Sequence, residues 1–176
     1  MLNARCFYRT LIAAFTFISV ACTCETEPSK YELNDQDKAF LTEQNQFFRT
    51  EIKISNTASV YGDEETKAQA RIMNSDFGTA LEKIQTISEN TKFDLDINFH
   101  DETTGELKAL DTLRERPFDS LYTHIESDRL HQAIILFDEE IEAGVEPSVV
   151  AFAKQHIIIL QRHASKMEEM ASLFGE

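Results

Sequence analysis

The chain contains 176 residues, of which 31 are acidic and 17 are basic, so its formal net charge at pH 7 is −14. A domain this acidic repels nucleic acid and anionic lipid head groups, which argues against both as binding partners. The length suits one domain with its own hydrophobic core. Three cysteines are too few for a disulfide-stabilised scaffold.

The first 21 residues have the pattern of a bacterial export signal. Arg5 and Arg9 precede an uncharged apolar run over residues 10–20. This run is too short to cross a bilayer, which takes about 20 apolar residues, so it predicts a cleaved signal peptide. Cys22 follows the small residues at its end, which predicts lipoprotein processing with Cys22 as the acylated first residue. Residues 19–21 also fit ordinary signal peptidase, which would release a plain secreted protein.

Residues 22–34 are polar and contain Pro28, which is typical of a tether between an anchor and a domain. Several acyl chains on Cys22 would anchor the protein stably, whereas a single chain gives only marginal binding. We therefore expect a protein on the periplasmic side of the cell envelope. It would be attached to the membrane through its N-terminal lipid and would carry one domain over residues 35–174.

From residue 35 onward, apolar residues recur in steps of three and four, the spacing of one helical face. Asp35 is the expected N-cap of a first helix that runs to about Tyr61 and stops at Gly62. A second helix starts at Asp63 and runs to about Glu89, and the short turn predicts an antiparallel hairpin. The expected buried stripes are Phe40, Gln44, Phe47, Glu51, Ile54, Ala58 and Tyr61, then Ala70, Met73, Phe77, Ala80, Ile84 and Ile87.

Residues 92–104 break this rhythm with a strand-like alternation that has no partner strand, so we expect an extended crossover. A short helix over residues 105–114 follows within it. Pro117 then lies in the first turn of a third helix to about Glu142, and Pro147 opens a fourth. Their expected stripes are Tyr122, Glu126, Leu130, Ala133, Phe137 and Ile141, then Val149, Ala153, His156, Leu160, His163, Met167, Met170 and Phe174. The whole pattern predicts an all-α, up-down antiparallel four-helix bundle with a long crossover.

Four polar residues interrupt these apolar stripes: Glu51, Glu126, His156 and His163. Bundle cores host metal and cofactor sites built from facing helices, and carboxylate and imidazole groups suit iron, manganese or zinc. The four residues are therefore candidate metal ligands. The competing explanation is structural: a Glu at the edge of a stripe keeps its carboxylate in water, and a His in a stripe is more often a hydrogen-bonded core residue.

The motifs of a complete catalytic centre are missing from the sequence. A di-iron bundle needs a Glu-x-x-His motif from each of two helices, and the chain has none. Asp128 and His131 come nearest, but they fall off the expected buried stripe. There is also no Gly-x-Ser-x-Gly elbow and no Gly-rich phosphate loop. We therefore predict neither an enzymatic activity nor a cofactor.

Four short segments resemble a known family. They are residues 37–41 (Asp-Lys-Ala-Phe-Leu), 51–58 (Glu-Ile-Lys-Ile-Ser-Asn-Thr-Ala), 118–122 (Phe-Asp-Ser-Leu-Tyr) and 160–163 (Leu-Gln-Arg-His), with agreeing order and spacing over about residues 34–167. The chain resembles the bacterial ferritin-like domain family of unknown function, whose members are often labelled predicted outer-membrane proteins. The resemblance implies an exported helical bundle, frequently a lipoprotein, at the outer membrane.

The chain departs from this family at two positions. Members typically carry Met-x-x-Asp-His on the second helix and a further His on the third. Phe77 stands where the first motif ends in His, and Leu130 stands at the second position, with His131 one place out of register. Only Glu51 and His163 match the polar core positions of the family. If members bind metal through those histidines, this chain has lost part of the set.

The sequence leaves three functions open. The leading hypothesis is a non-catalytic, lipid-anchored bundle of the cell envelope that binds an envelope protein or a small ligand. The rival is a metal-binding or oxidoreductase bundle that holds iron, manganese or zinc through Glu51, Glu126, His156 and His163. The third is a small-molecule sensor or scavenger with a pocket between the helices and the crossover.

Overall fold

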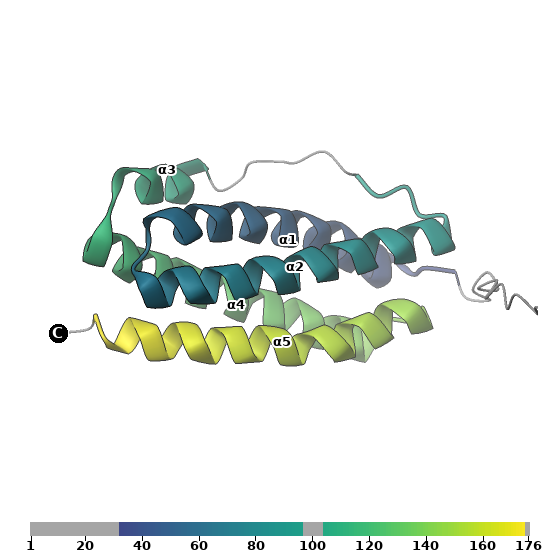
Figure 1. Cartoon of the computed structure of the whole chain (residues 1–176). Helices are drawn as coiled ribbons and strands as arrows, with labels where there is room; N and C mark the ends of the chain where they lie inside the picture. The colour runs from purple at the N-terminus through teal and green to yellow at the C-terminus, as the bar shows by residue number, and fades with distance from the viewer. Residues whose placement is uncertain (1–31, 97–103, 175–176) are drawn as a thin grey trace, which may run out of the picture.

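The computed structural model describes residues 32–96 and 104–174, and these ranges contain five helices and no strand. The helices are α1 (Asp35–Tyr61), α2 (Glu64–Thr91), α3 (Thr104–Thr112), α4 (Glu115–Ala143) and α5 (Pro147–Ser172). The hairpin of α1 and α2 packs against the hairpin of α4 and α5, which confirms the predicted helical bundle (Figure 1). The predicted signal peptide, Cys22 and most of the tether lie outside the described residues.

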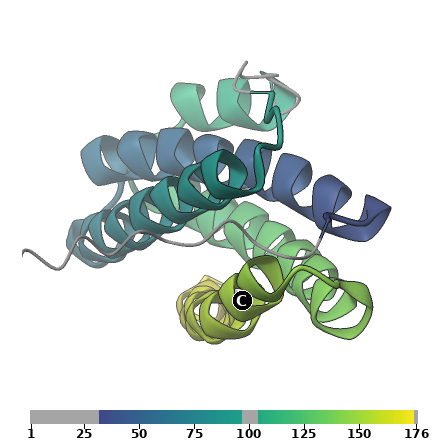
Figure 2. The same cartoon turned by 90° about the vertical axis from the view of Figure 1, so that its right-hand side faces the viewer.

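The helices run in alternating directions around the bundle. α4 begins at the end of the bundle where α2 also begins, so α2 and α4 run in the same direction and each neighbouring pair is antiparallel (Figure 1). The predicted short helix is present as α3, which packs outside the bundle against α1 and α4 (Figure 2). We call the end that contains the start of α1 and the α4–α5 turn the tether end. The opposite end, with the α1–α2 turn and the start of α4, is the distal end.

The hydrophobic core lies along the predicted stripes. Every predicted stripe residue of α2 is buried, as are the predicted residues of α5 from Val149 to Met170. Phe47, Tyr61, Ile141 and Phe174 are only half-buried, because they lie at the edge or end of their stripes. None of the helices in the described ranges is long and apolar enough to cross a membrane.

The start of α1 differs by one residue from the prediction. Asn34, rather than Asp35, is the N-cap. Its side chain accepts a hydrogen bond from Asp37 N at 2.7 Å, and the Asp37 carboxylate accepts one from Asn34 N at 2.8 Å. This reciprocal pair is a capping box, which satisfies two backbone donors at once. Asp37, three residues after Asn34, therefore decides which of two adjacent good capping residues is used.

The same carboxylate also ties α1 to the turn between α4 and α5. Asp37 Oδ1 accepts hydrogen bonds from Val145 N at 3.1 Å and Glu146 N at 3.2 Å, and Asn34 Nδ2 donates to Ala143 O at 3.0 Å. Asp37 is fully buried, so these bonds replace the water that its charge loses. This hydrogen-bond network around Asp37 thus holds the start of α1 to the α4–α5 turn at the tether end.

Glu140 lies fully buried beside the hydrogen-bond network around Asp37. Burial raises the pKa of the Glu140 carboxyl to about 8, and the hydrogen bond to Asp37 and the charge of Asp37 add to the rise. Glu140 is therefore protonated at neutral pH and shares its proton with the Asp37 carboxylate. Two buried acids can stand side by side because only one of them is charged.

Candidate functional site

Glu51 and Glu126, two of the predicted metal ligands, lie inside the bundle where α1 packs against α4. Both side chains are fully buried, so neither carboxylate is at the wet edge of its helix. Arg129 Nε of α4 donates to Glu51 Oε1 of α1 at 2.6 Å. The Arg129 guanidinium lies 5.8 Å from the centre of the Phe47 ring. This pair gives Glu51 the counter-ion that a buried carboxylate requires.

Tyr122 shows that the two acids share the middle of the bundle. Its hydroxyl donates to Met73 Sδ of α2 at 3.5 Å. Burial raises the pKa of Tyr122 well above its ordinary value, and the charges of Glu126 and Glu51 raise it further. Tyr122 is therefore a neutral donor at physiological pH, within the electrostatic reach of both carboxylates.

His163 lies between α5 and α2 and has a partner on each ring nitrogen. Nε2 is 3.0 Å from Asp76 Oδ2, and Nδ1 is 3.0 Å from Gln69 Nε2. Because an ionised carboxylate only accepts, the proton is assigned to Nε2, and Nδ1 accepts from the Gln69 amide. Burial lowers the pKa of His163 despite the opposing effect of Asp76. Phe77 packs against this ring, with 5.5 Å between the two ring centres. The resemblance would place a histidine at position 77.

His156 lies two turns away on α5. Its Nδ1 is 3.0 Å from Phe152 O, so Nδ1 carries a proton and donates, and its ring stacks on Phe152 at 4.2 Å. Burial lowers the pKa of His156. Within residues 32–96 and 104–174, no three His, Cys, Asp or Glu side chains are placed to hold a metal ion. Metal binding by the four predicted ligands stays a prediction.

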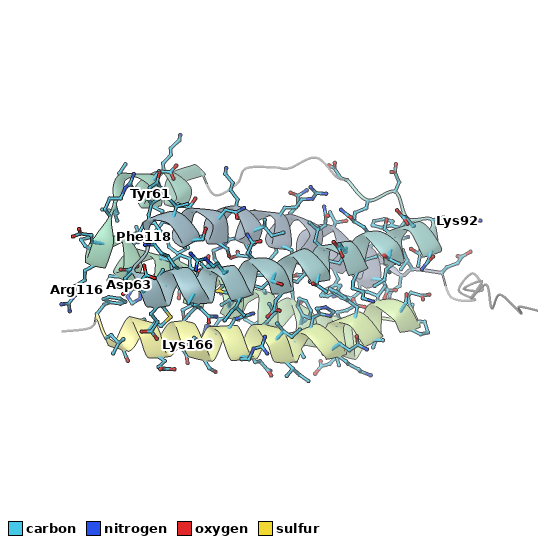
Figure 3. The ribbon with its side chains drawn as sticks, viewed as in Figure 1. Tyr61, Asp63, Lys92, Arg116, Phe118 and Lys166 are labelled. Carbon is cyan, nitrogen blue, oxygen red and sulfur yellow. The ribbon has the colours of Figure 1, made fainter. Side chains whose placement is uncertain are left out.

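A cleft of about 710 Å³ opens at the distal end. Three segments far apart in the sequence form it: the α1–α2 turn, the start of α4, and the chain after α5 (Figure 3). We call it the distal cleft. Its lining residues are Val60, Tyr61, Gly62, Asp63, Lys67, Arg114, Glu115, Arg116, Asp119, Leu173 and Phe174.

Arg114 is held in a fixed position at the mouth of the distal cleft. Its guanidinium carbon lies 3.6 Å from the centre of the Tyr61 ring, a close cation–π contact. Arg114 Nη1 donates to Asp111 O at 2.8 Å and also to Leu113 O. The stacking and the two backbone acceptors together fix the plane of the guanidinium group.

Arg116 contributes the second guanidinium of the cleft. Its Nη2 donates to Leu173 O at 3.5 Å, and its guanidinium carbon lies 6.0 Å from the centre of the Phe174 ring. Arg116 therefore connects the start of α4 to the chain end after α5. A third cation, Lys67, lines the cleft from α2 and pairs with Glu64 at 3.4 Å.

The nearby acids Asp63 and Asp119 are occupied by backbone donors. Asp119 Oδ1 accepts from Asp63 N at 3.0 Å, and Asp63 Oδ1 accepts from Thr66 N at 2.7 Å as the N-cap of α2. Asp119 is also almost completely buried. Both carboxylates therefore hold the α1–α2 turn to α4 and α2, and within the described residues neither forms an ion pair with Arg114 or Arg116.

The backbone is strained where α4 enters the cleft. Glu115 has φ 56°, the left-handed region that a residue with a side chain rarely adopts. Arg114, the N-cap of α4, makes no capping hydrogen bond with its side chain, whereas Asn34, Asp63 and Glu146 cap α1, α2 and α5. Strained residues of this kind concentrate at binding sites.

Sequence reasoning missed this cleft, because it followed polar residues inside helical stripes. One signal was available: Arg114 and Arg116 are the only two arginines in the chain that stand two positions apart. In a chain of net charge −14, that local excess of cations marks a segment unlike the rest.

The comparisons with known proteins identify a family without naming an activity. A family model described as a domain of unknown function, DUF4142, matches residues 22–170. No curated protein and no solved structure matches the chain. A family of unknown function was expected from the sequence and is confirmed, whereas its ferritin-like and outer-membrane character stay predictions.

Proposed function

This chain belongs to the DUF4142 family, whose function is unknown, and on that premise we propose that it is an exported, lipid-anchored protein of the cell envelope. We propose that it binds a ligand in the distal cleft without transforming it. The observation that carries this proposal is the cleft itself, with two arginines that have no ion pair among the described residues and a left-handed residue at its wall. Clefts with a few fixed polar groups are the usual form of ligand sites.

The N-terminal sequence supports the anchor. A basic start, a short apolar run and Cys22 after small residues form a lipoprotein signal. The family match begins at residue 22, which is the residue that lipoprotein processing would make the first of the mature chain. The two boundaries come from different observations and agree.

The arrangement of the two ends supports a role outside the membrane surface. α1 begins at the tether end, and the distal cleft lies at the other end of the bundle. A helix of 27 residues, the length of α1, is about 40 Å long. An N-terminal lipid would therefore present the cleft away from the bilayer, towards soluble or polymeric ligands of the envelope.

The lining of the cleft favours binding over catalysis. Its described residues include arginine, lysine, tyrosine and carboxylate groups, with no Ser, Cys or His among them. A nucleophile paired with a base is the usual signature of covalent catalysis. Fixed cations beside aromatic rings instead suit the recognition of an anionic group.

Processing of the full-length chain tests the anchor. We expect the wild-type protein to fractionate with membranes, to resist extraction by salt, and to accumulate as a larger precursor when globomycin blocks lipoprotein signal peptidase. Cys22→Ala should abolish this pattern, and the matched control Cys24→Ala should retain it. Export of the wild type as a soluble protein insensitive to globomycin would overturn the anchor. Retention in the cytosol would overturn the envelope location as well.

A further inference from the structure

The distal cleft also indicates the chemistry of its ligand. Resting on the proposed function, we infer that the cleft binds a small organic anion, with a carboxylate or phosphate group held by Arg114 and Arg116. An attached apolar group would lie against Val60, Leu173 and Phe174. Four separate observations lead to this ligand class: the missing ion pairs, the occupied acids, the fixed guanidinium and the exposed apolar rim.

Arg114 and Arg116 are not neutralised by an acid in the part of the chain that the structure describes, unlike Arg129 and Arg162. Arg129 pairs with Glu51 at 2.6 Å, and Arg162 pairs with Asp76 at 2.7 Å. Over residues 32–96 and 104–174, neither Arg114 nor Arg116 has a carboxylate oxygen within 4.0 Å. Exposed cations elsewhere, such as Arg71 and Lys83, also have no ion pair among the described residues, but Arg114 and Arg116 differ from them because both line one cleft. Two neighbouring guanidinium groups without an acidic partner form a local site for an external anion.

The acids that line the cleft are kept from neutralising these arginines. The Asp63 and Asp119 carboxylates accept backbone hydrogen bonds at 2.7 and 3.0 Å, which fix them in the turn between α1 and α2. Glu115 stands between the two arginines in the sequence, but its left-handed backbone turns the chain at that point. Asp63 and Asp119 thus have structural contacts, whereas the exposed Glu115 lines the cleft and forms no ion pair with either arginine among the described residues.

Arg114 is organised for binding before a ligand arrives. Its Nη1 donates to Asp111 O and Leu113 O, and its guanidinium group lies over the Tyr61 ring. The Nε and Nη2 donors have no partner among the described residues. These two donors form one edge of the planar fork, which matches two oxygens of a carboxylate or phosphate. A fixed side chain loses less conformational entropy on binding than a mobile one.

The apolar rim explains why the ligand should be more than an inorganic ion. Val60 and Leu173 each expose 63% of their surface, and both line the cleft. The half-buried ring of Phe174 also lines the cleft, and its centre is 6.0 Å from the Arg116 guanidinium carbon. Exposed apolar residues gathered beside fixed cations fit an amphiphilic anion, because its apolar part would cover surface that water now contacts.

Isothermal titration calorimetry on the full processed chain, in detergent and without phosphate in the buffer, tests this inference. The probes are phenylphosphate and benzoate, which share a ring but differ in the anion. Benzyl alcohol is the neutral counterpart, and inorganic phosphate and acetate lack the ring. We expect each aromatic anion to bind at least tenfold more tightly than benzyl alcohol and than the matching ring-free anion. The stronger of the two then identifies phosphate or carboxylate as the natural group.

Variants at the cleft make the test specific. Arg114→Gln should weaken binding of the aromatic anions about tenfold or more, since a charge-assisted hydrogen bond is lost. Arg116→Gln should weaken it several-fold, and Arg114→Lys should be intermediate, because it keeps the charge without the planar fork. Glu115→Gln should tighten binding. Arg71→Gln, on an exposed position of α2, is the matched control and should change affinity less than twofold.

The possible outcomes separate this inference from the proposed function. If benzyl alcohol binds as tightly as the anions, or if Arg114→Gln and Arg116→Gln leave the affinity unchanged, the ligand class is wrong while the cleft can still be a binding site. If no probe binds at millimolar concentration, both the ligand class and the assignment of this cleft fail. Circular dichroism of each variant confirms that the helices are intact.

Discussion

At the tether end of the bundle, backbone donors from three positions meet the buried Asp37 carboxylate, while at the distal end Arg114 and Arg116 have no ion pair among the described residues. The contrast is clearest at the helix starts. Asn34 opens α1 with a reciprocal capping box, whereas Arg114 opens α4 without a side-chain cap and is followed by Glu115 at φ 56°. We therefore expect the tether end to contribute more to the stability of the fold than the distal end, where we propose a binding site.

The largest effect on stability should follow from removing the Asp37 carboxylate, the centre of the hydrogen-bond network at the tether end. Asp37→Ala leaves the N–H groups of Asn34, Val145 and Glu146 without their acceptor. An unpaired buried donor such as Glu146 N costs about 1–3 kcal/mol, and the part-buried N–H groups of Asn34 and Val145 cost less. We therefore expect a loss of about 2–4 kcal/mol in the free energy of unfolding. Urea denaturation followed by circular dichroism measures it.

The matched control for that variant lies two residues earlier. Asp35→Ala removes an exposed acid that pairs only with exposed Lys38, at 3.9 Å. Such a pair contributes less than about 1 kcal/mol. If Asp35→Ala and Asp37→Ala lowered the free energy of unfolding equally, the hydrogen-bond network around Asp37 would not be the source of that stability.

The pH dependence of stability should also originate at the tether end. The folded chain holds the Glu140 proton up to a pKa of about 8, whereas the unfolded chain releases it above 4.5, the ordinary value. The folded state therefore binds more protons between these values, and stability falls as the pH rises. The slope from this one group is at most about 1.4 kcal/mol per pH unit.

Glu140→Gln isolates that contribution, because its amide has no proton to lose and can still donate to Asp37. Denaturation curves at pH 5, 6, 7 and 8 should show the variant gaining stability relative to the wild type as the pH rises. Parallel stability profiles for the two proteins would show that Glu140 is already charged in the folded state.

Two glycines offer a direct comparison of the ends. A Cβ on Gly144, at the tether end, would lie 2.6 Å from the backbone oxygen of Glu140. A Cβ on Gly62, at the distal end, would meet the side chain of Thr66, with Thr66 Cβ at 2.7 Å. A side chain can move more easily than a helix backbone, so we expect Gly144→Ala to cost about 3 kcal/mol and Gly62→Ala about 1 kcal/mol.

Thermal unfolding of these two glycine variants checks their order. A larger loss at Gly62 would show that the distal end is packed as tightly as the tether end. Such a result would contradict the expected difference in packing between the two ends.

The smallest effect is a gain in stability at the distal end. Glu115→Gly removes the cost of a left-handed backbone for a residue with a side chain, about 1 kcal/mol. Lys92→Gly is the control, because Lys92 has φ 57° at the C-cap of α2. Both variants should be slightly more stable in urea, and only Glu115→Gly should change the affinity for aromatic anions. A loss of stability at Glu115 would mean that its side chain, and not its backbone, matters most there.

The helices could be predicted because their information is local and repeated. Steps of three and four place Met73, Phe77 and Ala80 on one face whatever the rest of the chain does, and all three are buried. The N-cap of α1 was harder, since Asn34 and Asp35 are both good caps. The choice depends on Asp37, which also bonds to the α4–α5 turn more than 100 residues away.

The environment of the core residues was less predictable. Periodicity placed Glu51 and His163 inside the bundle, and both are buried there. It could not show that Arg129 neutralises Glu51, or that Gln69 and Asp76 occupy both nitrogens of His163. Those partners lie on other helices, and their rotational position is set by packing between hairpins.

The distal cleft joins residues between 60 and 67, between 114 and 119, and at 173 and 174, so its parts are separated by up to 114 positions along the chain. A polypeptide that is still being threaded across a membrane has at most some of these parts in place. If the chain is exported and binds a ligand as proposed, recognition would become available only after translocation and tertiary assembly are complete. An unfolded molecule would then pass its own ligand in the cytoplasm without capturing it.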